Sequence, residues 1–325
     1  MKYVAVTLKG AEDLASAEIK SLLKADSKKV ADARLLFSAR SLGNFSPRLT
    51  SRIYSYIGHF YFSSLNDLIK KSFKFKFSFK GSFVVRCSRE GQHNFDSREI
   101  ERGVGEVIYN KGFRVDLKNP DNTIIVDIID NKCFIGVLVS DNLCRRPYRV
   151  RIFSSSINAC LAAAAVKFSE AKSSDTILDP FCRDGVIPIE ASLLGCKNVF
   201  AFDESMNNVR NAKINAKLAG ANVKFAKCNI DSLDLKLDEK SIDRVITYPP
   251  FPSKKKKQSG IENLYKEFFY QVSPLLKKSA TITLISHKLE LLEIYAKRAG
   301  FKIIKQKNVF VSNNNYILMI LESNK

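Results

Sequence analysis

Hydrophobic and polar positions follow two different patterns in the two halves of the chain. In the first half, stretches with a period of two predict strands, and stretches with helical spacing predict helices. The expected strands cover residues 4–8, 30–38, 83–88, 123–129 and 132–139, and the expected helices cover residues 12–23, 47–57 and 98–109. Ser97 is the expected cap of the last helix, and an Asp130-Asn131 turn joins the last two strands.

Residues 73–80 alternate without a break between Phe and either Lys or Ser. This period predicts a half-buried strand whose Phe side chains face the core and whose Lys side chains face water. An alternative is that the Phe rings stack on nucleic-acid bases. The alternation by itself accounts for the pattern, so we prefer the core interpretation.

From residue 157 to the end, short apolar strands alternate with helices. The expected strands cover residues 176–178, 199–202, 224–227, 244–247, 281–286, 301–307 and 316–321, and the expected helices cover residues 157–168, 186–194, 206–219, 265–276 and 289–299. This alternation indicates an α/β fold in which helices cover both faces of a mostly parallel, Rossmann-like sheet. The basic segment before it, residues 145–151, breaks both periods and is a candidate linker.

The positive charge of the chain is unevenly distributed. The 325 residues carry a formal net charge of +20. Residues 1–100 and residues 251–325 each have nine more basic than acidic residues, whereas residues 101–250 have only two more. Basic surfaces at both ends favour a polyanionic partner, and nucleic acid is the usual one. The alternative is a lysine-rich composition that covers every surface.

Several classes of protein are disfavoured by what the sequence lacks. No run of about 18 apolar residues exists, which argues against a transmembrane helix, and residues 1–7 resemble a strand rather than a signal peptide. Seven cysteines form no C-x-x-C pair, and three histidines lie far apart, so we expect neither a disulfide framework nor a metal site. A reducing cytoplasm is the expected location, with no membrane partner.

Polar and aromatic residues follow four successive strands of the second half, at the positions where doubly wound sheets bind ligands. They are Asp179, Phe181 and Gly185 in the first loop, Asp203 and Glu204 in the second, Ile230 and Asp231 in the third, and Tyr248, Pro249, Pro250 and Phe251 in the fourth. A Gly-containing loop that opens a helix presents backbone N–H groups to an anionic group.

The order of these features predicts the cofactor S-adenosylmethionine. Asp179 is acidic, so it suits a cofactor that carries an ammonium group. Asp203 stands where an acid takes two ribose hydroxyls, and the third loop suits an adenine edge. The G-x-G-x-x-G fingerprint of nicotinamide enzymes is absent.

The second half resembles class I S-adenosylmethionine-dependent methyltransferases that act on guanine N2 in RNA. The segments that carry this resemblance are residues 179–182 with Gly185, residues 189–191 and residues 215–220. Residues 1–144 resemble the ferredoxin-like part and the THUMP domain of the same family, through residues 86–95, 100–105 and 116–120.

The resemblance implies a domain order and an activity. It implies a ferredoxin-like part in residues 1–58, a THUMP RNA-binding domain in residues 59–144, a linker in residues 145–156 and a Rossmann-like methyltransferase domain in residues 157–325. The THUMP domain would grip the RNA, most often tRNA, while the second domain methylates a base amine. The sequence does not specify the nucleotide, the oligomeric state or a partner subunit.

The chain departs from the family pattern in two loops. In the family, an Asn or Asp and the first Pro of (N/D)-P-P-(F/Y) accept the two N–H bonds of the guanine amine, and the aromatic residue stacks on the base. Here Tyr248 takes the first position, and Arg183 and Asp184 replace a Gly and a Ser of the cofactor loop. Asp184 would repel the methionyl carboxylate, although Arg183 could pair with either group.

Three hypotheses follow from these departures. The first is an active guanine-N2 methyltransferase that tolerates Tyr248. The second is an RNA-binding protein whose methyltransferase domain is degenerate, with weak or no activity. The third is a methyltransferase for another base nitrogen in tRNA or rRNA.

Two groups of basic residues are candidate RNA contacts. They are Arg86, Arg89, Arg98 and Arg102 in the THUMP-like region and Lys254, Lys255, Lys256 and Lys257 after the catalytic loop. A solvated loop is the alternative for the lysine run. Ser156 and Asn158 stand where they could touch the methionyl end of the cofactor, although capping the following helix is the preferred interpretation.

Overall fold

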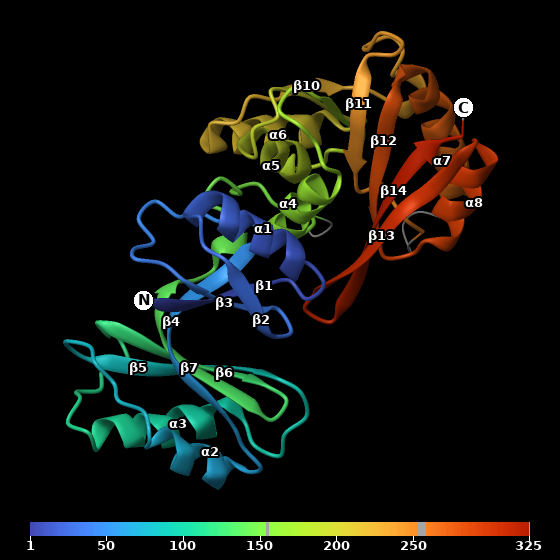
Figure 1. Cartoon of the computed structure of the whole chain (residues 1–325). Helices are drawn as coiled ribbons and strands as arrows, with labels where there is room; N and C mark the ends of the chain where they lie inside the picture. Colours follow the sequence, from blue (N-terminus) through green and yellow to red (C-terminus); the bar gives the residue numbers. More distant parts are fainter. Residues whose placement is uncertain (154–155, 253–257, 325) are drawn as a thin grey trace. The chain divides into compact units, whose positions relative to one another are not determined.

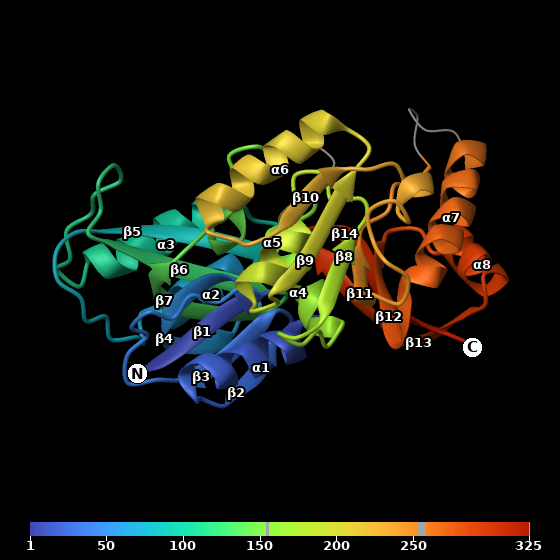
Figure 2. The ribbon, with the colours of Figure 1, turned by 90° about the horizontal axis from the view of Figure 1, so that it is seen from above.

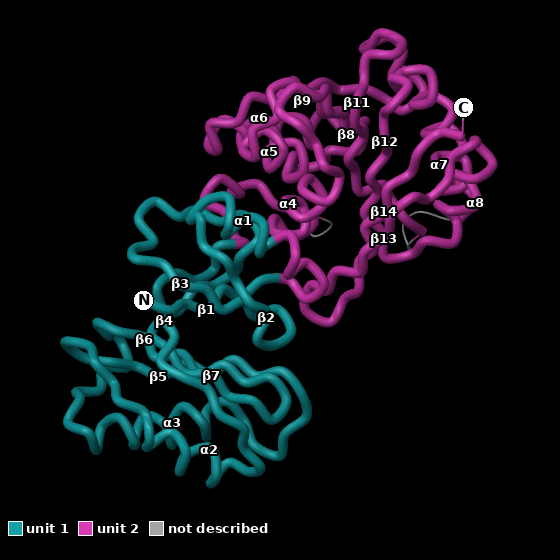
Figure 3. Tube along the Cα trace, in the orientation of Figure 1, with its two compact units in different colours: residues 1–7, 15–143 teal, residues 8–14, 144–325 magenta. Residues whose placement is uncertain are grey.

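The computed structural model describes residues 1–153, 156–252 and 258–324. The described chain divides into two compact units, which Figure 3 shows in two colours. Unit 1 comprises residues 1–7 and 15–143, and unit 2 comprises residues 8–14 and 144–325. Among the described residues, no helix is long and apolar enough to cross a membrane.

Unit 1 is built on a seven-stranded sheet in the order β2-β3-β1-β4-β7-β6-β5. Its strands are β1 (Lys2–Thr7), β2 (Ser27–Ala31), β3 (Arg34–Ser38), β4 (Thr50–Tyr61), β5 (Phe83–Glu90), β6 (Asn122–Ile129) and β7 (Lys132–Ser140). Only the β5–β6 pair is parallel. Its helices are α1 (Glu12–Leu23), α2 (Leu65–Ser72) and α3 (Ser97–Tyr109). Figure 1 shows α1 beside β1 and the pair α2 and α3 beside β5 and β6.

The sheet of unit 1 is strongly curved. Three strands lie between β3 and β6 in the sheet order, so about 19 Å would separate them in a flat sheet. Yet Arg34 of β3 reaches Asp127 of β6 with N–O distances of 2.7 and 2.8 Å. A buried cluster also joins Val4, Tyr54, Ile125 and Phe134 from four strands. The curvature therefore brings β3 and β6, which are not neighbours in the sheet, within side-chain contact.

Three predictions for unit 1 are wrong, in addition to that for residues 73–80 below. Residues 47–57 are not a helix but contain the first part of β4, because Ile53, Tyr54 and their neighbours pair with β1 and β7, which are distant in sequence. Residues 30–38 form two strands, with a turn in which Ala33 has a φ of +57°. The cap of α3 is Asp96, not Ser97, and Asp96 and Glu99 make a reciprocal capping box.

The alternating Phe segment is not a strand. Residues 75–80 follow α2 without joining a sheet. The burial pattern holds in part, because Phe75, Phe77 and Phe79 pack into the core of unit 1 while Phe73 is 49% exposed. Phe79 lies with its ring centre 4.3 Å from that of Phe113. The prediction of a core role is therefore confirmed for three rings, and the prediction of a strand is wrong.

Unit 2 has the predicted Rossmann-like sheet, in the order β10-β9-β8-β11-β12-β14-β13. Its strands are β8 (Thr176–Asp179), β9 (Asn198–Asp203), β10 (Lys224–Lys227), β11 (Ile242–Thr247), β12 (Leu276–Ser286), β13 (Phe301–Val311) and β14 (Asn314–Ser323). The first five strands in this order run parallel, and the hairpin of β13 and β14 adds an antiparallel edge.

Helices cover both faces of this sheet, as Figure 2 shows. They are α4 (Ala159–Phe168), α5 (Val186–Leu193) and α6 (Met206–Ala219) on one side and α7 (Gln258–Val272) and α8 (Glu290–Arg298) on the other. Short 3₁₀ turns η1 (Leu143–Arg145), η2 (Ile230–Ser232) and η3 (Ser273–Leu275) complete the elements. The main core lies between the sheet and α7 and α8. Asn158 caps α4, as predicted, whereas Ser156 hydrogen-bonds to Phe153 instead.

Unit 2 also includes a short piece from the start of the chain. Residues 8–14 follow β1, and Lys9 forms an antiparallel bridge with Phe310 of β13. Lys307 Nζ lies 2.9 Å from a carboxylate oxygen of Asp13. A Cβ atom on Gly10 would collide with the backbone of Asn308, so this close approach requires glycine.

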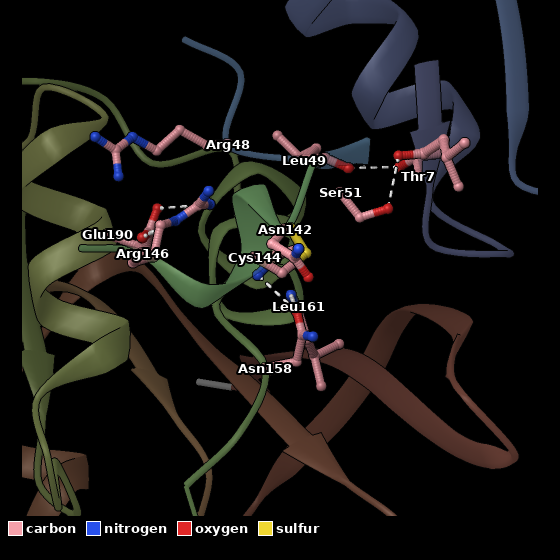
Figure 4. Close-up of a disulfide and its surroundings, with 12 residues drawn as sticks. Thr7, Arg48, Leu49, Ser51, Asn142, Cys144, Arg146, Asn158, Leu161 and Glu190 are labelled. Carbon is pink, nitrogen blue, oxygen red and sulfur yellow. Dashed lines mark hydrogen bonds and ion pairs between the residues drawn. A yellow bond between two sulfur atoms is a disulfide. The ribbon is translucent and has the colours of Figure 1, made fainter. Parts of the chain in front are cut away.

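The expectation that the cysteines make no disulfide is wrong for one pair. Cys144 in η1 and Cys160 in the first turn of α4 form a disulfide, with their Cα atoms 5.4 Å apart (Figure 4). The sequence spacing gave no sign of it, because the chain must turn back over 16 residues to bring the two together. The remaining five cysteines are free.

Candidate active site

The predicted cofactor residues lie at one edge of the sheet of unit 2. Because β9, β8 and β11 are parallel neighbours, the loops after their carboxyl ends meet. Thr247 at the end of β11 donates a 2.6 Å hydrogen bond to Asp179 at the end of β8. Arg183 N donates a 3.0 Å hydrogen bond to Asp203 at the end of β9. Three loops that are distant in sequence are thus tied together by their acidic and hydroxyl groups.

Asp179 is a buried carboxyl group with one engaged oxygen. Its Oδ1 accepts hydrogen bonds from Thr247 and from Phe181 N, while no described residue donates to Oδ2. Burial raises the pKa of Asp179 to about 7, although these two hydrogen bonds act in the opposite direction. The open oxygen of a buried carboxylate fits a cation such as the ammonium group of the predicted cofactor.

The cofactor loop turns through two residues with left-handed backbone. Arg183 has a φ of +50° and Gly185 a φ of +82°. The left-handed backbone of Gly185 favours glycine, and a Cβ atom there would also lie only 3.0 Å from that of Ala212. Gly185 caps α5 without a side chain, which leaves the first N–H groups of that helix facing the loop.

Asp203 fixes the second loop. Its Oδ1 accepts hydrogen bonds from Ser205 N at 3.0 Å and from Asn208 Nδ2 at 2.8 Å. Both oxygens therefore already have donors, and ribose hydroxyls would add to this set or replace part of it. Glu204 beside it is exposed.

The third loop contributes η2, which contains Ile230 and Asp231. Ile230 is half-buried against the core, while Asp231 is exposed and accepts a hydrogen bond from the hydroxyl of its neighbour Ser232. Gln271 of α7 binds the backbone oxygen of Asp231 at 3.2 Å. This contact fixes the backbone of the loop and leaves the Asp231 carboxylate accessible.

The two charged substitutions in the cofactor loop have separate partners. Asp184 is 1% exposed, and Arg149 lies 3.2 Å from its carboxylate, not Arg183 as considered from the sequence. Asn215 of α6 joins the same group, because its amide donates to the backbone oxygens of Asp184 and Arg151. Nε of Arg149 has no hydrogen-bond partner in the described part of the chain. The negative charge of Asp184 is therefore compensated by Arg149, whose own hydrogen-bond donors are only partly used.

A second buried pair attaches the same basic segment to α5. Arg146 and Tyr148 both bind Glu190, with distances of 2.9 and 2.7 Å to its Oε1 (Figure 4 shows the arginine pair). Glu190 is fully buried. Residues 146–151 thus pack against the helices behind the cofactor loop, which sequence patterns could not show because each partner is more than 30 residues away.

Tyr248 lies in a cluster of aromatic rings at the same edge. Its ring centre is 5.9 Å from that of Phe251, 6.1 Å from that of His287 and 6.2 Å from that of Tyr316. Arg183 lies over the Tyr248 ring, 4.7 Å from its centre. Burial raises the pKa of Tyr248 well above its usual value, so the phenol stays protonated at neutral pH. The position of Pro250 is fixed by α7, because its carbonyl accepts a 2.6 Å hydrogen bond from the Tyr265 hydroxyl.

His287 and Tyr316 were missed by sequence analysis. His287 directly follows β12, so its position after a strand is the signal that could have identified it. Tyr316 lies on β14, an antiparallel strand, and nothing in the sequence indicates that it returns to this edge. The lysine run 254–257 lies outside the described residues.

Three of the four predicted arginines of unit 1 line one groove. Arg86, Arg98 and Arg102 face a cavity of about 730 Å³ between α3 and β5, which also has Glu101, Glu106 and the exposed Tyr109 and Leu117 in its wall. Arg89 does not line this groove and instead lies over the ring of Phe95.

Comparison with known proteins identifies both parts of the chain. Residues 146–317 match the model of the RMKL-like methyltransferase domain, and residues 61–138 match the THUMP domain. The chain belongs to the RMKL-like methyltransferase family. The predicted family and the predicted fold class are thereby confirmed.

Two curated relatives and one solved structure show how far the likeness extends. A tRNA (guanine(6)-N2)-methyltransferase of Archaeoglobus fulgidus is 26% identical over 95% of this chain and 89% of its own length. A tRNA (guanine(10)-N2)-dimethyltransferase of Methanothermobacter thermautotrophicus is 33% identical over 68% of this chain and 67% of its own length. The crystal structure of TrmN from Thermus thermophilus superposes with a TM-score of 0.82 at 26% identity, covering 99% of both chains.

Proposed function

We propose that this protein is a tRNA methyltransferase that transfers a methyl group from S-adenosylmethionine to guanine N2. The observation that carries the proposal is the edge where Asp179, Asp203 and the Pro-Pro-Phe loop meet, in a chain of the RMKL-like methyltransferase family. The relatives that match most of the chain are named for this reaction.

Each loop has a role in the proposal. Asp179 binds the ammonium group through its open oxygen, the N-terminus of α5 faces the carboxylate, and Asp203 binds the ribose. The bound cofactor supplies an electrophilic methyl group on a sulfonium. Phe251 stacks on the base, and the carbonyl of Pro249 accepts one N–H of the amine. Positioning of this kind lowers the barrier by at most about 7–11 kcal/mol.

RNA binding is the second part of the proposal. The groove lined by Arg86, Arg98 and Arg102 accepts phosphates, with residues 59–144 acting as the RNA-binding domain and the lysine run 254–257 as a further contact. Each phosphate contact contributes a slope of about 0.7–0.9 in the dependence of log affinity on log salt. Replacing Arg98 and Arg102 by Gln should reduce this slope by up to about 1.8. An unchanged slope would remove the groove from the RNA-binding surface.

The decisive experiment combines binding with product mapping. Titration calorimetry should show S-adenosylmethionine binding to the full-length protein, and Asp203→Ala should abolish it. Incubation with unmodified tRNA transcripts, followed by nucleoside mass spectrometry, should give N2-methylguanosine at one position. A methyl group on a different base nitrogen would assign the chain to the third hypothesis.

One observation favours an alternative function. Arg183 lies on Tyr248, where the family has Gly and Asn or Asp, and this contact places a cation beside the loop that must receive the base. A protein that binds RNA but does not transfer methyl groups would bind RNA and would not bind the cofactor, even at millimolar cofactor concentration. The calorimetric titration separates this alternative from the proposed enzyme.

A further inference from the structure

The proposed reaction lacks an acceptor at the position where the family has Asn or Asp. Methylation of an exocyclic amine requires that one N–H proton leaves the nitrogen. The Tyr248 phenol is poorly suited to receive it, because Arg183 lies over its ring and the group is 5% exposed. A replacement acceptor must face the Pro-Pro-Phe loop at the same edge.

His287 is placed at this edge by two strands. It is the first residue after β12, whose end lies beside the end of β11 in a parallel ladder. The antiparallel register that pairs Ser286 with Ile317 brings His287 opposite Tyr316 of β14. The two ring centres are 3.7 Å apart. The imidazole is therefore held in place by packing against the ring of Tyr316.

The ring of His287 also lies near two aromatic rings of the Pro-Pro-Phe loop region, those of Phe251 and Tyr248. Its plane is steeply inclined to those of Phe251 and Tyr248, by 78° and 74°, at ring-centre distances of 5.8 and 6.1 Å. Phe251 is the residue that stacks on the base in the proposed function. A base stacked there would bring its substituents within the space that His287 borders.

The hydrogen bonding of His287 sets its tautomer. Nδ1 lies 3.2 Å from the backbone oxygen of Asn315. A carbonyl only accepts hydrogen bonds, so Nδ1 carries the proton and Nε2 presents a lone pair. No described residue donates to Nε2. The ring is half-buried, so it can return a proton to solvent after each turnover.

We propose that His287 is a catalytic residue whose Nε2 accepts the proton of the base amine. This inference rests on the proposed function, since it names the acceptor in that reaction. The amine nitrogen forms its bond to the methyl carbon as the carbon–sulfur bond breaks, and that electron pair stays on sulfur as a thioether. One N–H proton passes to Nε2, which leaves a neutral methylated amine and an imidazolium.

The first test measures single-turnover methyl transfer by variants of position 287. His287→Phe keeps a ring against Tyr316 and removes both nitrogens, so the rate should fall at least about 100-fold with unchanged affinity for tRNA and cofactor. His287→Gln keeps a hydrogen-bond acceptor that takes up no proton, so its rate should lie between those of the wild type and the Phe variant. Wild-type rates in His287→Phe would overturn the proposal.

Two control variants locate the effect. Tyr248→Phe removes only the phenol oxygen, and a loss equal to that of His287→Phe would give the role to Tyr248 instead. Tyr270→Phe changes an exposed aromatic residue of α7 and should leave the rate unchanged. If this variant and His287→Phe lose activity equally, a specific role of His287 is refuted.

The pH dependence supplies a readout that a structural role would not move. The acid limb of the wild-type pH–rate profile should be absent from the residual rate of His287→Gln, because the variant has lost the proton acceptor. The charged and titratable groups around the ring are Tyr248, Tyr316, Arg183 beyond Tyr248, and Lys288 next in the chain. All of these remain in the variant, so persistence of the acid limb would contradict the proposal.

A spectroscopic test is independent of turnover. The chain has only three histidines, so selective ¹⁵N labelling gives few ring signals, and His287→Gln assigns one of them. The free protein should show the Nδ1–H tautomer. Adding S-adenosylhomocysteine and unmodified tRNA should shift the Nε2 resonance of His287; an unmoved resonance would refute contact with the base. Absence of methyl transfer by the wild type would instead refute the proposed function.

Discussion

Each unit buries an arginine against an aspartate, and the two pairs differ in how completely they are satisfied. In unit 1, Asp127 accepts from Arg34 twice, from Tyr54 and from Ser88, and Arg34 also binds Glu90. In unit 2, Arg149 makes one contact of 3.2 Å to Asp184 and leaves Nε without a described partner. The Arg34–Asp127 pair, whose hydrogen bonds are all made, joins strands. The Arg149–Asp184 pair, which leaves a donor unused, lies at the cofactor loop.

This difference reflects where the two pairs lie: Asp127 is in a sheet, and Asp184 is in a loop. Burial alone would raise the pKa of Asp127, but the bonds from Arg34, Ser88 and Tyr54 hold it below its usual value. Such a group stays charged and fixes the curvature of the sheet. The Arg149–Asp184 pair lies at the loop where the proposed cofactor binds, and there the buried Nε of Arg149 has no partner among the described residues.

Breaking the saturated pair should have the largest effect. Arg34→Met leaves Asp127 buried and unpaired, which should lower the free energy of unfolding of unit 1 by about 3–5 kcal/mol. Hydrogen exchange followed by mass spectrometry resolves the two units. The matched control is Arg52→Met, because the Arg52–Asp141 pair has similar geometry but is about 30% exposed, and its loss should cost no more than about 1 kcal/mol. Equal costs would show that burial is not the deciding factor.

Removing the disulfide should have the next largest effect, in unit 2. Cys144→Ser should lower the free energy of unfolding by about 3 kcal/mol, because a loop of about this length is no longer closed in the unfolded chain. Cys160→Ser and the double variant should give the same loss, since all three break one bond. Denaturation in the presence of a thiol reductant should bring the wild type to the same value. If the reductant leaves the free energy of unfolding of the wild type unchanged, the disulfide between Cys144 and Cys160 is contradicted.

Breaking the unsaturated pair should cost less. Arg149→Gln leaves Asp184 without its cation, and an unpaired buried group costs about 1–3 kcal/mol. We expect a 5- to 100-fold weaker cofactor affinity in titration calorimetry. Adding Asp184→Asn should restore most of the affinity, because the uncompensated charge is gone. Failure of this rescue would show that Arg149 acts on the cofactor directly rather than through Asp184.

The smallest effect concerns Asp179, a buried carboxyl group to which no arginine side chain donates a hydrogen bond in the described parts of the chain. With its pKa raised to about 7, the free protein is increasingly protonated below that pH, and a bound ammonium group favours the ionised form. Cofactor affinity should therefore fall about tenfold for each pH unit below 7 and level off above it. Calorimetry in buffers of different ionisation enthalpy should detect proton release at pH 6. A cofactor affinity that does not change with pH would contradict the proposal that Asp179 binds the ammonium group.

Local patterns were sufficient for most of unit 2. Residues 206–219 were predicted as a helix with the observed ends, because Gly220 ends it and the apolar spacing is regular. The strand-end acids could be placed because parallel strands put their carboxyl ends at one edge. The order of the edge hairpin, and with it Tyr316, could not be predicted, because it depends on pairing between strands and not on any local signal.

Unit 1 was harder to predict for the same reason. Residues 47–57 have helical spacing but become strand through pairing with β1 and β7, so tertiary contacts override the local period. The Phe-Lys segment has strand spacing, yet its rings pack without a ladder. The partners of Asp184 and Glu190 come from residues 146–149, and only the folded chain brings them together.

Unit 2 is discontinuous along the chain, and this limits how the protein can be dissected. A recombinant fragment that starts at residue 144 would lack residues 8–14, and the Lys9–Phe310 bridge and the Lys307–Asp13 ion pair would be lost with them. The edge of β13 would then be free to pair with another copy, as unprotected strands do. An N-terminal deletion meant to remove only RNA binding would thus also alter the catalytic unit, so point substitutions are the cleaner tool.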